Sequence, residues 1–334
     1  MFRYSLLPFL LLTFIACQTT APPTQAISFA GKTMGSYYKI TYFDPQGRNL
    51  QSSIDSFLLV FNNSTSTYLT ESTISTFNKG TKLTTQDAFL LPLLKASKKI
   101  YQETDGHFDP TIMPLVNHWG FGYEQKKSVS QSSVDSLLNL VDFNKIAFQS
   151  LSKSQYILQK EQKAMQLDFS AIAKGYGVDL IGELLEKRGI SAYLIDIGGE
   201  MRAAGNKPDG TAWKVAIAEP VEDSNQQQAG LLLKNRSLAS SGNYRNFYVK
   251  DGKKLVHTIN PKTGYPEISN LLSASIVANT CMEADAYATA CMVMGLEKAK
   301  VFVLGKKDLE ALFIYGDEGN GFQIWQTEGL ERLF

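Results

Sequence analysis

The order of strand-like and helix-like segments constrains the fold of this chain more than any other feature of its sequence. Residues 37–43 alternate aromatic or β-branched side chains with polar ones, which predicts a strand. Residues 50–61 and 88–101 carry apolar side chains at helical spacing, and Pro92 should kink or delay the second of these helices. The N-terminal part of the fold is therefore expected to combine strands and amphipathic helices.

The rest of the chain changes between the two patterns several times. A short strand, a loop and a helix are expected between residues 166 and 189, followed by a buried strand at 193–197. The remaining predicted elements are strands at 214–218, 237–240, 246–249 and 273–278, helices at 280–294 and 296–304, and a final strand pair at 311–315 and 321–326. Runs of strands and runs of helices together predict an α+β fold, with a mixed or antiparallel sheet and helices packed on it.

Length and charge limit the class of protein. The chain has 334 residues, of which 44% are hydrophobic and 19% charged, enough for a large buried core. The 33 basic and 32 acidic residues form no long block of either sign, so no electrostatic footprint for nucleic acid is present. Because no Pro, Gly and Ser linker separates two hydrophobic bodies, we expect one continuous unit with two lobes.

The N-terminus has the pattern of a bacterial lipoprotein signal peptide. Arg3 precedes an apolar run at residues 6–15, and Cys17 follows a small residue, as in the lipobox where lipoproteins are cleaved and acylated. The alternative is an ordinary secreted protein that is cut nearby. We expect residues 1–16 to be the signal peptide, residues 17–26 the lipidated Cys17 and its tether, and residues 27–334 the functional domain. This arrangement predicts a lipid-anchored protein on the periplasmic side of the cell envelope.

Two short motifs could meet a phosphorylated ligand. Asp168 and Lys174 flank a loop that leads into a helix, and a Lys at a helix start lies where backbone N–H groups favour phosphate. The alternative for Lys174 is a solvated side chain. Asp196 begins an Asp-Ile-Gly-Gly-Glu motif in which two glycines after a strand let the backbone approach a ligand closely. A tight turn without a ligand would explain the same motif.

Two further motifs suggest a cation and a general base. Asp285 and Thr289 are four residues apart in a predicted helix and therefore share one face, which suits a Mg²⁺ half-site. A helix-capping acid and a back-bonded Thr are the alternative. His257 precedes a Pro- and Gly-containing turn and is a candidate general base near neutral pH, although a structural hydrogen-bonding role would also account for it.

Aromatic, Gly and Pro residues concentrate in residues 106–110 and 114–122. This density predicts loops that shape a pocket, in which a planar ring could stack.

Taken together and in this order, the motifs resemble the ApbE family of FAD:protein FMN transferases over nearly the whole mature chain. Each motif alone is weak, but seven in the correct order are specific. The motifs are Thr33-Met34-Gly35, Ser66-Thr67-Tyr68, Gly106 to Pro110, Asp168 to Gly175, Asp196 to Glu200, His257 to Pro266, and Glu283 to Thr289.

The resemblance implies a T-fold-like α+β unit and assigns roles to its residues. The metal would be Mg²⁺, held by Asp285, Thr289 and the backbone carbonyl of Ala171. Departures from the family pattern are His107, Asn260 and, in the lipobox, Phe14. The residues that would line the FAD site are Met34, Tyr68, His107, Phe108, Asp109, Asp168, Lys174 and Ile259.

The reaction that the resemblance implies transfers FMN from FAD to a Thr or Ser hydroxyl of a client flavoprotein and releases AMP. The clients would be subunits of Nqr- or Rnf-type redox pumps. Mg²⁺ and Lys174 could neutralise the negative charge that builds on the pyrophosphate, His257 could accept the hydroxyl proton, and Asp196 is an alternative base. Two other functions remain open at this point: an FAD pyrophosphatase that yields FMN and AMP, and a flavin-binding lipoprotein without catalysis.

Overall fold

One large antiparallel sheet forms the frame of the molecule. The computed structural model describes residues 25–123, 128–218, 227–243, 247–250, 253–317 and 321–330. Within these ranges each pair of neighbouring strands in the eight-stranded sheet is antiparallel. The sheet order is β1 (Ala26–Thr33), β2 (Ser36–Phe43), β6 (Ala192–Ile197), β7 (Glu200–Ala204), β10 (Arg236–Gly242), β13 (Leu271–Ala278), β14 (Glu310–Gly316) and β15 (Phe322–Gln326).

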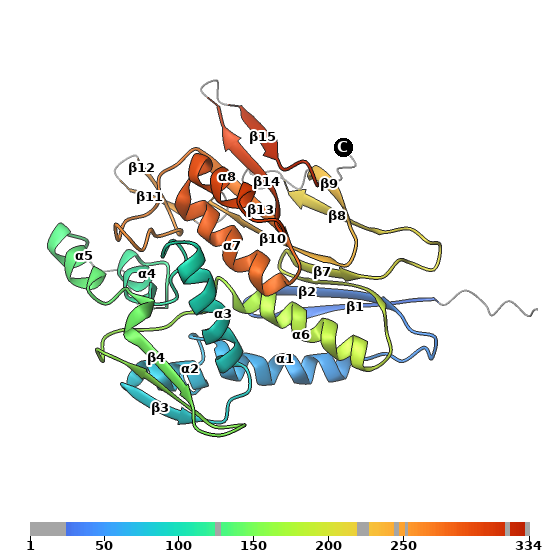
Figure 1. Ribbon diagram of the computed structural model, residues 1–334, viewed down its shortest axis with the longest axis horizontal. Helices are drawn as coiled ribbons and strands as arrows, with labels where there is room; N and C mark the ends of the chain where they lie inside the picture. Colours follow the sequence, from blue (N-terminus) through green and yellow to red (C-terminus); the bar gives the residue numbers. More distant parts are fainter. Residues whose placement is uncertain are drawn as a thin grey trace, which may run out of the picture.

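The two faces of this sheet are covered differently (Figure 1). Helices α6 (Ala173–Lys187) and α7 (Cys281–Met294) pack on one face, where Ala239 and Ile276 join their core. The next residues along the strands, Leu238 and Val277, point to the opposite face because side chains alternate. On that face they pack against a hairpin of β8 (Trp213–Ala218) and β9 (Gln227–Leu233).

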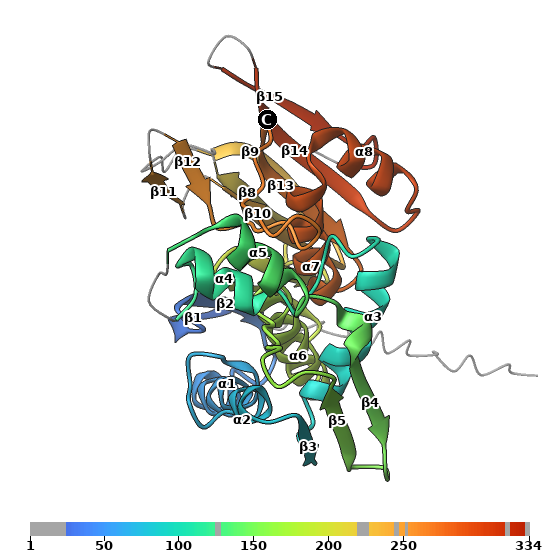
Figure 2. The same ribbon diagram turned by 90° about the vertical axis from the view of Figure 1, so that its left-hand side faces the viewer.

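A second group of elements makes the other lobe, whose small sheet lies at the opposite end of the molecule from β8 and β9 (Figures 1 and 2). Its three strands are β3 (Lys82–Thr85), β5 (Tyr156–Lys160) and β4 (Ile146–Ser150), in that order. The remaining elements of the described chain are α1 (Gln51–Thr65), α2 (Thr73–Lys79), α3 (Leu90–Glu103), α4 (Met113–Trp119), α5 (Gln131–Leu138), the 3₁₀ turn η1 (Phe143–Lys145), β11 (Phe247–Lys250), β12 (Lys253–Val256) and α8 (Leu296–Leu304).

Helices α6 and α7 are joined by reciprocal hydrogen bonds, in which backbone N–H groups at the start of each helix donate to a carboxylate on the other. Asp179 on α6 accepts the backbone N–H groups of Cys281 at 3.0 Å and of Met282 at 2.9 Å, which are free at the start of α7. In return, Asp285 Oδ2 on α7 accepts the N–H of Gly175 in the first turn of α6 at 3.0 Å. The two helix starts are thereby fixed against each other.

Gly175 is required at this crossing because nothing larger fits. A Cβ atom added there would lie 2.2 Å from the carbonyl oxygen of Cys281 and 2.9 Å from Cβ of Asp285. Both distances are below van der Waals contact, and the first involves backbone that cannot rotate away.

The predicted α+β class is confirmed, and the sheet is antiparallel. The helices and strands expected after residue 193 appear within a few residues of their predicted bounds. Pro92 is the third residue of α3, which begins at Leu90, so Pro92 lies in the first turn, where its missing N–H has no intrahelical partner to lose.

Two other predictions about local structure were wrong. No strand forms at the start of the 166–189 segment, where Gln166 makes only an isolated bridge to Ile112. The expected loop at 114–122 is mostly helix, because α4 occupies residues 113–119.

Strand β1 begins at Ala26, which is the last residue of the range expected to be the tether. The signal peptide and Cys17 lie outside the described residues. In the part of the chain that the structure does describe, no helix is long and apolar enough to cross a membrane.

Replacement of Gly175 by Ala should destabilise the fold by about 1–3 kcal/mol, because the added methyl group overpacks the crossing of α6 and α7. Gly177→Ala is the matched control in the same helix, where the added Cβ would lie 3.5 Å or more from its neighbours and Ala favours a helix. Urea unfolding of both variants checks this prediction. Equal stability of the Gly175→Ala variant and the unchanged protein would contradict it.

Candidate active site

A cavity of about 440 Å³ lies where the start of α6, one face of α7 and loops of both lobes meet. Several of the residues singled out from the sequence contribute to its lining. The lining residues among them are Tyr68, His107, Phe108, Asp109, Asp168, Ala171, Lys174, His257, Ile259, Asp285 and Thr289. The chain folds so that motifs far apart in sequence surround one space.

Three charged side chains meet on one side of the cavity. Lys174 Nζ lies 2.7 Å from Glu200 Oε1, and both side chains line the cavity together with Asp285. Burial by itself would lower the pKa of Lys174, but the carboxylates of Glu200 and Asp285 raise it above its ordinary value, so the ammonium is held in its charged form. Burial raises the pKa of Glu200, and the proximity of Asp285 raises it further, against the effect of Lys174.

These groups and their neighbours fit a divalent cation. Lys174 forms an ion pair with Glu200 only, and burial raises the pKa values of both Glu200 and Asp285, so one ammonium does not offset the two buried carboxyl groups. Glu200 Oε2 is also buried without a hydrogen-bond partner, and a cation would stabilise the ionised forms. Asp285 and Thr289 lie on the same face of α7 and both line the cavity, as does Ala171. Within the described ranges, no group of three or more His, Cys, Asp and Glu side chains could hold a metal ion by itself. The donors present are hard oxygen atoms, which suit a Mg²⁺ half-site completed by a ligand's phosphate oxygens.

The two candidate bases are placed differently. His257 lines the cavity, with its ring edge-on to Phe121 at 6.5 Å between centroids. Asp196 does not contribute to the cavity lining in the described structure. Its carboxylate accepts the N–H of Gly199 at 2.8 Å and the hydroxyl of Tyr37 at 3.3 Å. A tight turn therefore accounts for Asp196 itself, with left-handed φ angles of 64° at Gly198 and 104° at Gly199, whereas Gly198 and Glu200 of the same motif line the cavity.

The ring-binding candidates surround the cavity, with one exception. Phe108 and Ile259 are buried in its wall, whereas Tyr68 is 65% exposed and its ring meets the ring of Tyr123 edge-on at 6.1 Å. Met34, in contrast, is absent from the lining among the described residues and packs against the hydrophobic cores. The structure therefore does not bring Met34 to the other candidates.

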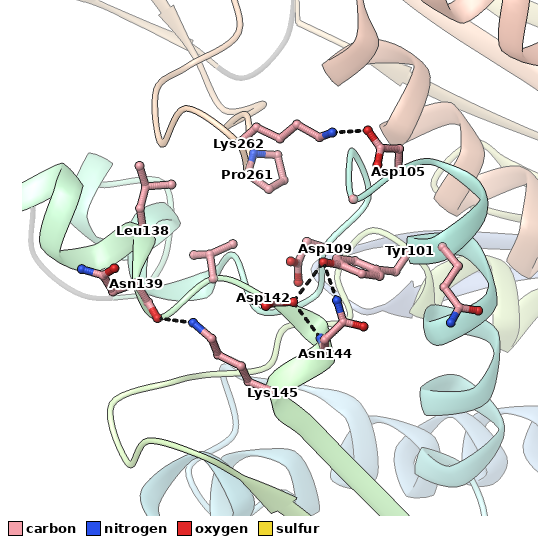
Figure 3. Close-up of a pocket in the computed structure, with 13 residues that line it drawn as sticks. Tyr101, Asp105, Asp109, Leu138, Asn139, Asp142, Asn144, Lys145, Pro261 and Lys262 are labelled. Atoms are coloured by element: carbon pink, nitrogen blue, oxygen red, sulfur yellow. Dashed lines mark hydrogen bonds and ion pairs between the residues drawn. The ribbon is translucent and has the colours of Figure 1, made fainter.

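A second cavity of about 510 Å³ (Figure 3) shares two lining residues, Asp109 and Pro261, with the first. Its polar groups are largely paired with one another. Lys262 pairs with Asp105, Lys145 Nζ donates to the carbonyl of Asn139 at 2.9 Å, and Tyr101 donates to Asp142 at 3.0 Å. The buried oxygen without a partner and the candidate base are found in the first cavity, which we therefore take as the site.

Glu200 is the functional residue that sequence reasoning missed. It appeared only as the last residue of the Asp-Ile-Gly-Gly-Glu motif, and no spacing rule connects it with Lys174 in another part of the chain. An acidic residue directly after a Gly-Gly turn, at the first position of a buried strand, was the available signal.

The fold and the site together define the class of protein. It is an α+β protein whose cavity combines a partly buried Lys, hard oxygen groups and aromatic side chains, a combination that suits a phosphorylated ligand with a planar ring. The sequence profile of the ApbE family matches residues 34–313. The chain therefore belongs to the ApbE family.

Individual relatives agree with this assignment. The chain is 34% identical over 328 residues to the FAD:protein FMN transferase of Escherichia coli strain K12, covering 95% of this chain and 93% of that protein. It is also 34% identical over 334 residues to the FAD:protein FMN transferase of Haemophilus influenzae, covering 96% of this chain and 94% of the relative.

Solved structures show the same fold. The flavin transferase ApbE from Vibrio cholerae superposes with a TM-score of 0.79 at 30% identity, covering 92% of this chain and 98% of that one. The apo form of the flavinyl transferase ApbE from Pseudomonas stutzeri gives a TM-score of 0.80 at 30% identity, covering 92% of this chain and 96% of the other.

Asp109 should make stability depend on pH. Burial raises its pKa from 3.8 to about 6, although hydrogen bonds from Thr111 and Phe143 oppose the shift. A carboxyl group with a raised native pKa contributes stability that is complete below pH 3.8 and is lost as the pH rises through about 6, about 3 kcal/mol in total. Urea unfolding of the unchanged protein and of Asp109→Asn between pH 4 and 7.5 measures this pH-dependent part of the free energy of unfolding. The variant lacks it because an Asn side chain does not titrate. Parallel pH profiles for the two proteins would contradict the prediction, whatever their absolute difference.

Proposed function

We propose that this protein is a Mg²⁺-dependent FAD:protein FMN transferase, which attaches FMN from FAD to a Thr or Ser hydroxyl of client flavoproteins and releases AMP. The observation that carries the proposal is the convergence of Lys174, Asp285, Thr289 and His257 on one cavity. The names of the relatives, which are FAD:protein FMN transferases, support the same activity. The exposed aromatic ring of Tyr68 and the buried rings and aliphatic groups of the wall suit the flat surfaces of FAD.

The proposed reaction is a displacement at the phosphorus of the FMN half of FAD. The client hydroxyl oxygen forms a bond to this phosphorus, and the bond from the phosphorus to the bridging oxygen breaks, so AMP leaves with the bridging oxygen. His257 accepts the proton of the attacking hydroxyl. Lys174 stabilises negative charge on the phosphate oxygens, and its ion pair with Glu200 fixes where the ammonium lies.

Asp285, Thr289 and the carbonyl of Ala171 would hold the Mg²⁺ ion. When bound, Mg²⁺ would neutralise the negative charge that develops on the pyrophosphate. Asp285 is already oriented for this role, because one of its oxygens is fixed by the N–H of Gly175. We assign the base to His257 and not to Asp196, since both oxygens of Asp196 already accept hydrogen bonds outside the cavity.

The proposal extends to the cellular setting. The signal-like sequence and Cys17 support a lipid anchor on the periplasmic side of the envelope, with the inner membrane favoured by the family resemblance. Clients of the Nqr or Rnf type are subunits of membrane redox pumps, which an anchored enzyme could reach.

Incubation with FAD, Mg²⁺ and a candidate client that carries a target Thr should increase the client mass by one FMN group and release AMP. Intact-protein mass spectrometry and nucleotide chromatography measure the two products. Asp285→Ala should abolish most of this Mg²⁺-dependent transfer. FMN and AMP without a change in client mass would indicate an FAD pyrophosphatase instead, and unchanged FAD would indicate a binding protein.

His257→Ala should lower the transfer rate about 100-fold or more at pH 7, because the attacking hydroxyl loses its proton acceptor. FAD binding should remain, since Lys174 and the ring-binding residues are unchanged. His118→Gln is the control, because His118 lies outside the cavity lining and its hydrogen bond with Ser133 can be kept by an amide. Normal transfer by His257→Ala with intact FAD binding would rule out His257 as the base.

A further inference from the structure

The loop that carries His107 is fixed by backbone hydrogen bonds at the end of α3. The N–H of Gly106 donates to the carbonyl of Tyr101 at 2.8 Å, and the N–H of His107 donates to the carbonyl of Thr104 at 3.1 Å. The N–H of Phe108 donates to the Thr104 hydroxyl at 3.2 Å. These hydrogen bonds fix the backbone that carries His107, whose side chain contributes to the cavity wall.

The hydrogen bond of the His107 ring determines its tautomer. Nδ1 lies 2.7 Å from the carbonyl oxygen of Thr104, and because a carbonyl can only accept, Nδ1 must carry the proton. Burial lowers the pKa of His107 below its ordinary value of 6.5, and Lys262 and Lys298 lower it further, so the ring is neutral at pH 7. Nε2 is then a hydrogen-bond acceptor, and no hydrogen bond within the described residues uses it.

Other candidate acceptors near this part of the cavity already accept hydrogen bonds. Both oxygens of Asp109 accept hydrogen bonds, Oδ1 from the backbone N–H and the hydroxyl of Thr111 and Oδ2 from the N–H of Phe143. Asp168 Oδ1 accepts from the backbone N–H and the hydroxyl of Ser170, and within the described residues its Oδ2 has no hydrogen bond. Apolar side chains, among them Phe108 and Met113, make up much of the surrounding wall. Nε2 of His107 is therefore a neutral acceptor within a largely apolar wall. Such an acceptor suits a hydrogen bond from an N–H group on the edge of a flat ring that packs against this wall.

We propose that His107 is a specificity-determining residue whose Nε2 accepts a hydrogen bond from an N–H group on the edge of the adenine or isoalloxazine ring of bound FAD. The inference rests on the proposed function, which makes FAD the ligand. FAD has two such groups, the 6-amino group of adenine and N3–H of the isoalloxazine ring. An acceptor at Nε2 should give FAD a higher affinity than an analogue without this N–H group, because Nε2 and the altered group of the analogue would both be buried without a hydrogen-bond partner.

Two FAD analogues separate the two donors. Flavin hypoxanthine dinucleotide replaces the adenine amino group by an oxygen, and N3-methyl-FAD lacks N3–H. Isothermal titration with Mg²⁺ and without client should show about 10-fold weaker binding of one analogue than of FAD by the unchanged protein. The other analogue should bind like FAD.

Variants of His107 test whether this loss arises at Nε2. His107→Phe keeps a ring of similar size without an acceptor, so it should bind FAD about 10-fold more weakly and should no longer distinguish the affected analogue from FAD. His107→Gln is the control that restores function, because its amide can donate to Thr104 and accept from FAD, and discrimination should return in part.

The outcomes separate this inference from the proposed function. If the unchanged protein does not bind FAD, the proposed function fails. If it binds FAD and both analogues equally, or if His107→Phe keeps the full discrimination, the role of His107 is wrong and the proposed function stands. Should His107→Phe fail to fold, equal binding of FAD and both analogues by the unchanged protein would still overturn the role of His107, and His107→Leu, which also lacks an acceptor, would replace His107→Phe as the test of discrimination.

Discussion

The paired helix starts of α6 and α7 are the constraint on which the site depends. Asp179 and Asp285 each accept backbone N–H groups from the first turn of the other helix. Carboxylates at helix N-termini are favoured by the helix dipole as well as by these hydrogen bonds. Because Gly175 has no side chain, the helices approach closely enough to bring Lys174 and Asp285 to one cavity. Lys174, Asp285 and Thr289 thus lie on rigid helices, whereas the candidate base His257 lies on a loop.

The charged cluster is placed for a ligand and not for stability. The carboxyl groups of Glu200 and Asp285 are buried, the Lys174 side chain is partly buried, and Glu200 leaves one oxygen without a partner. Burial of charge costs free energy that one ion pair seldom recovers. A cation and an anionic pyrophosphate would complete the pairing, so ligand binding should recover part of this cost. Active sites commonly retain such unfavourable arrangements because function requires them.

Sequence reasoning succeeded where a pattern is local and failed where the fold brings distant residues together. The four-residue spacing of Asp285 and Thr289 predicted their common helix face, and the position of Lys174 at a helix start was correct. The pairing of Lys174 with Glu200 has no local signature, because it depends on how α6 lies against β7. Met34 and Asp196 belong to motifs beside the cavity, and the direction of their side chains depends on packing that spacing does not encode. Helix α4 was missed because Gly and Pro residues around it suggested a loop.

The order of the elements along the chain also determines when the cavity can exist. Its wall includes Tyr68 near the beginning and Thr289 near the end, and α7 lies in the last part of the sequence. A growing chain therefore contains Lys174 long before it contains Asp285, and this pair forms only after contacts of long sequence separation are made. Substrate affinity should consequently appear late in folding and in a single step. Ligand binding would then stabilise only completed molecules, so the enzyme's own substrate could act as a selective stabiliser of the fully folded chain.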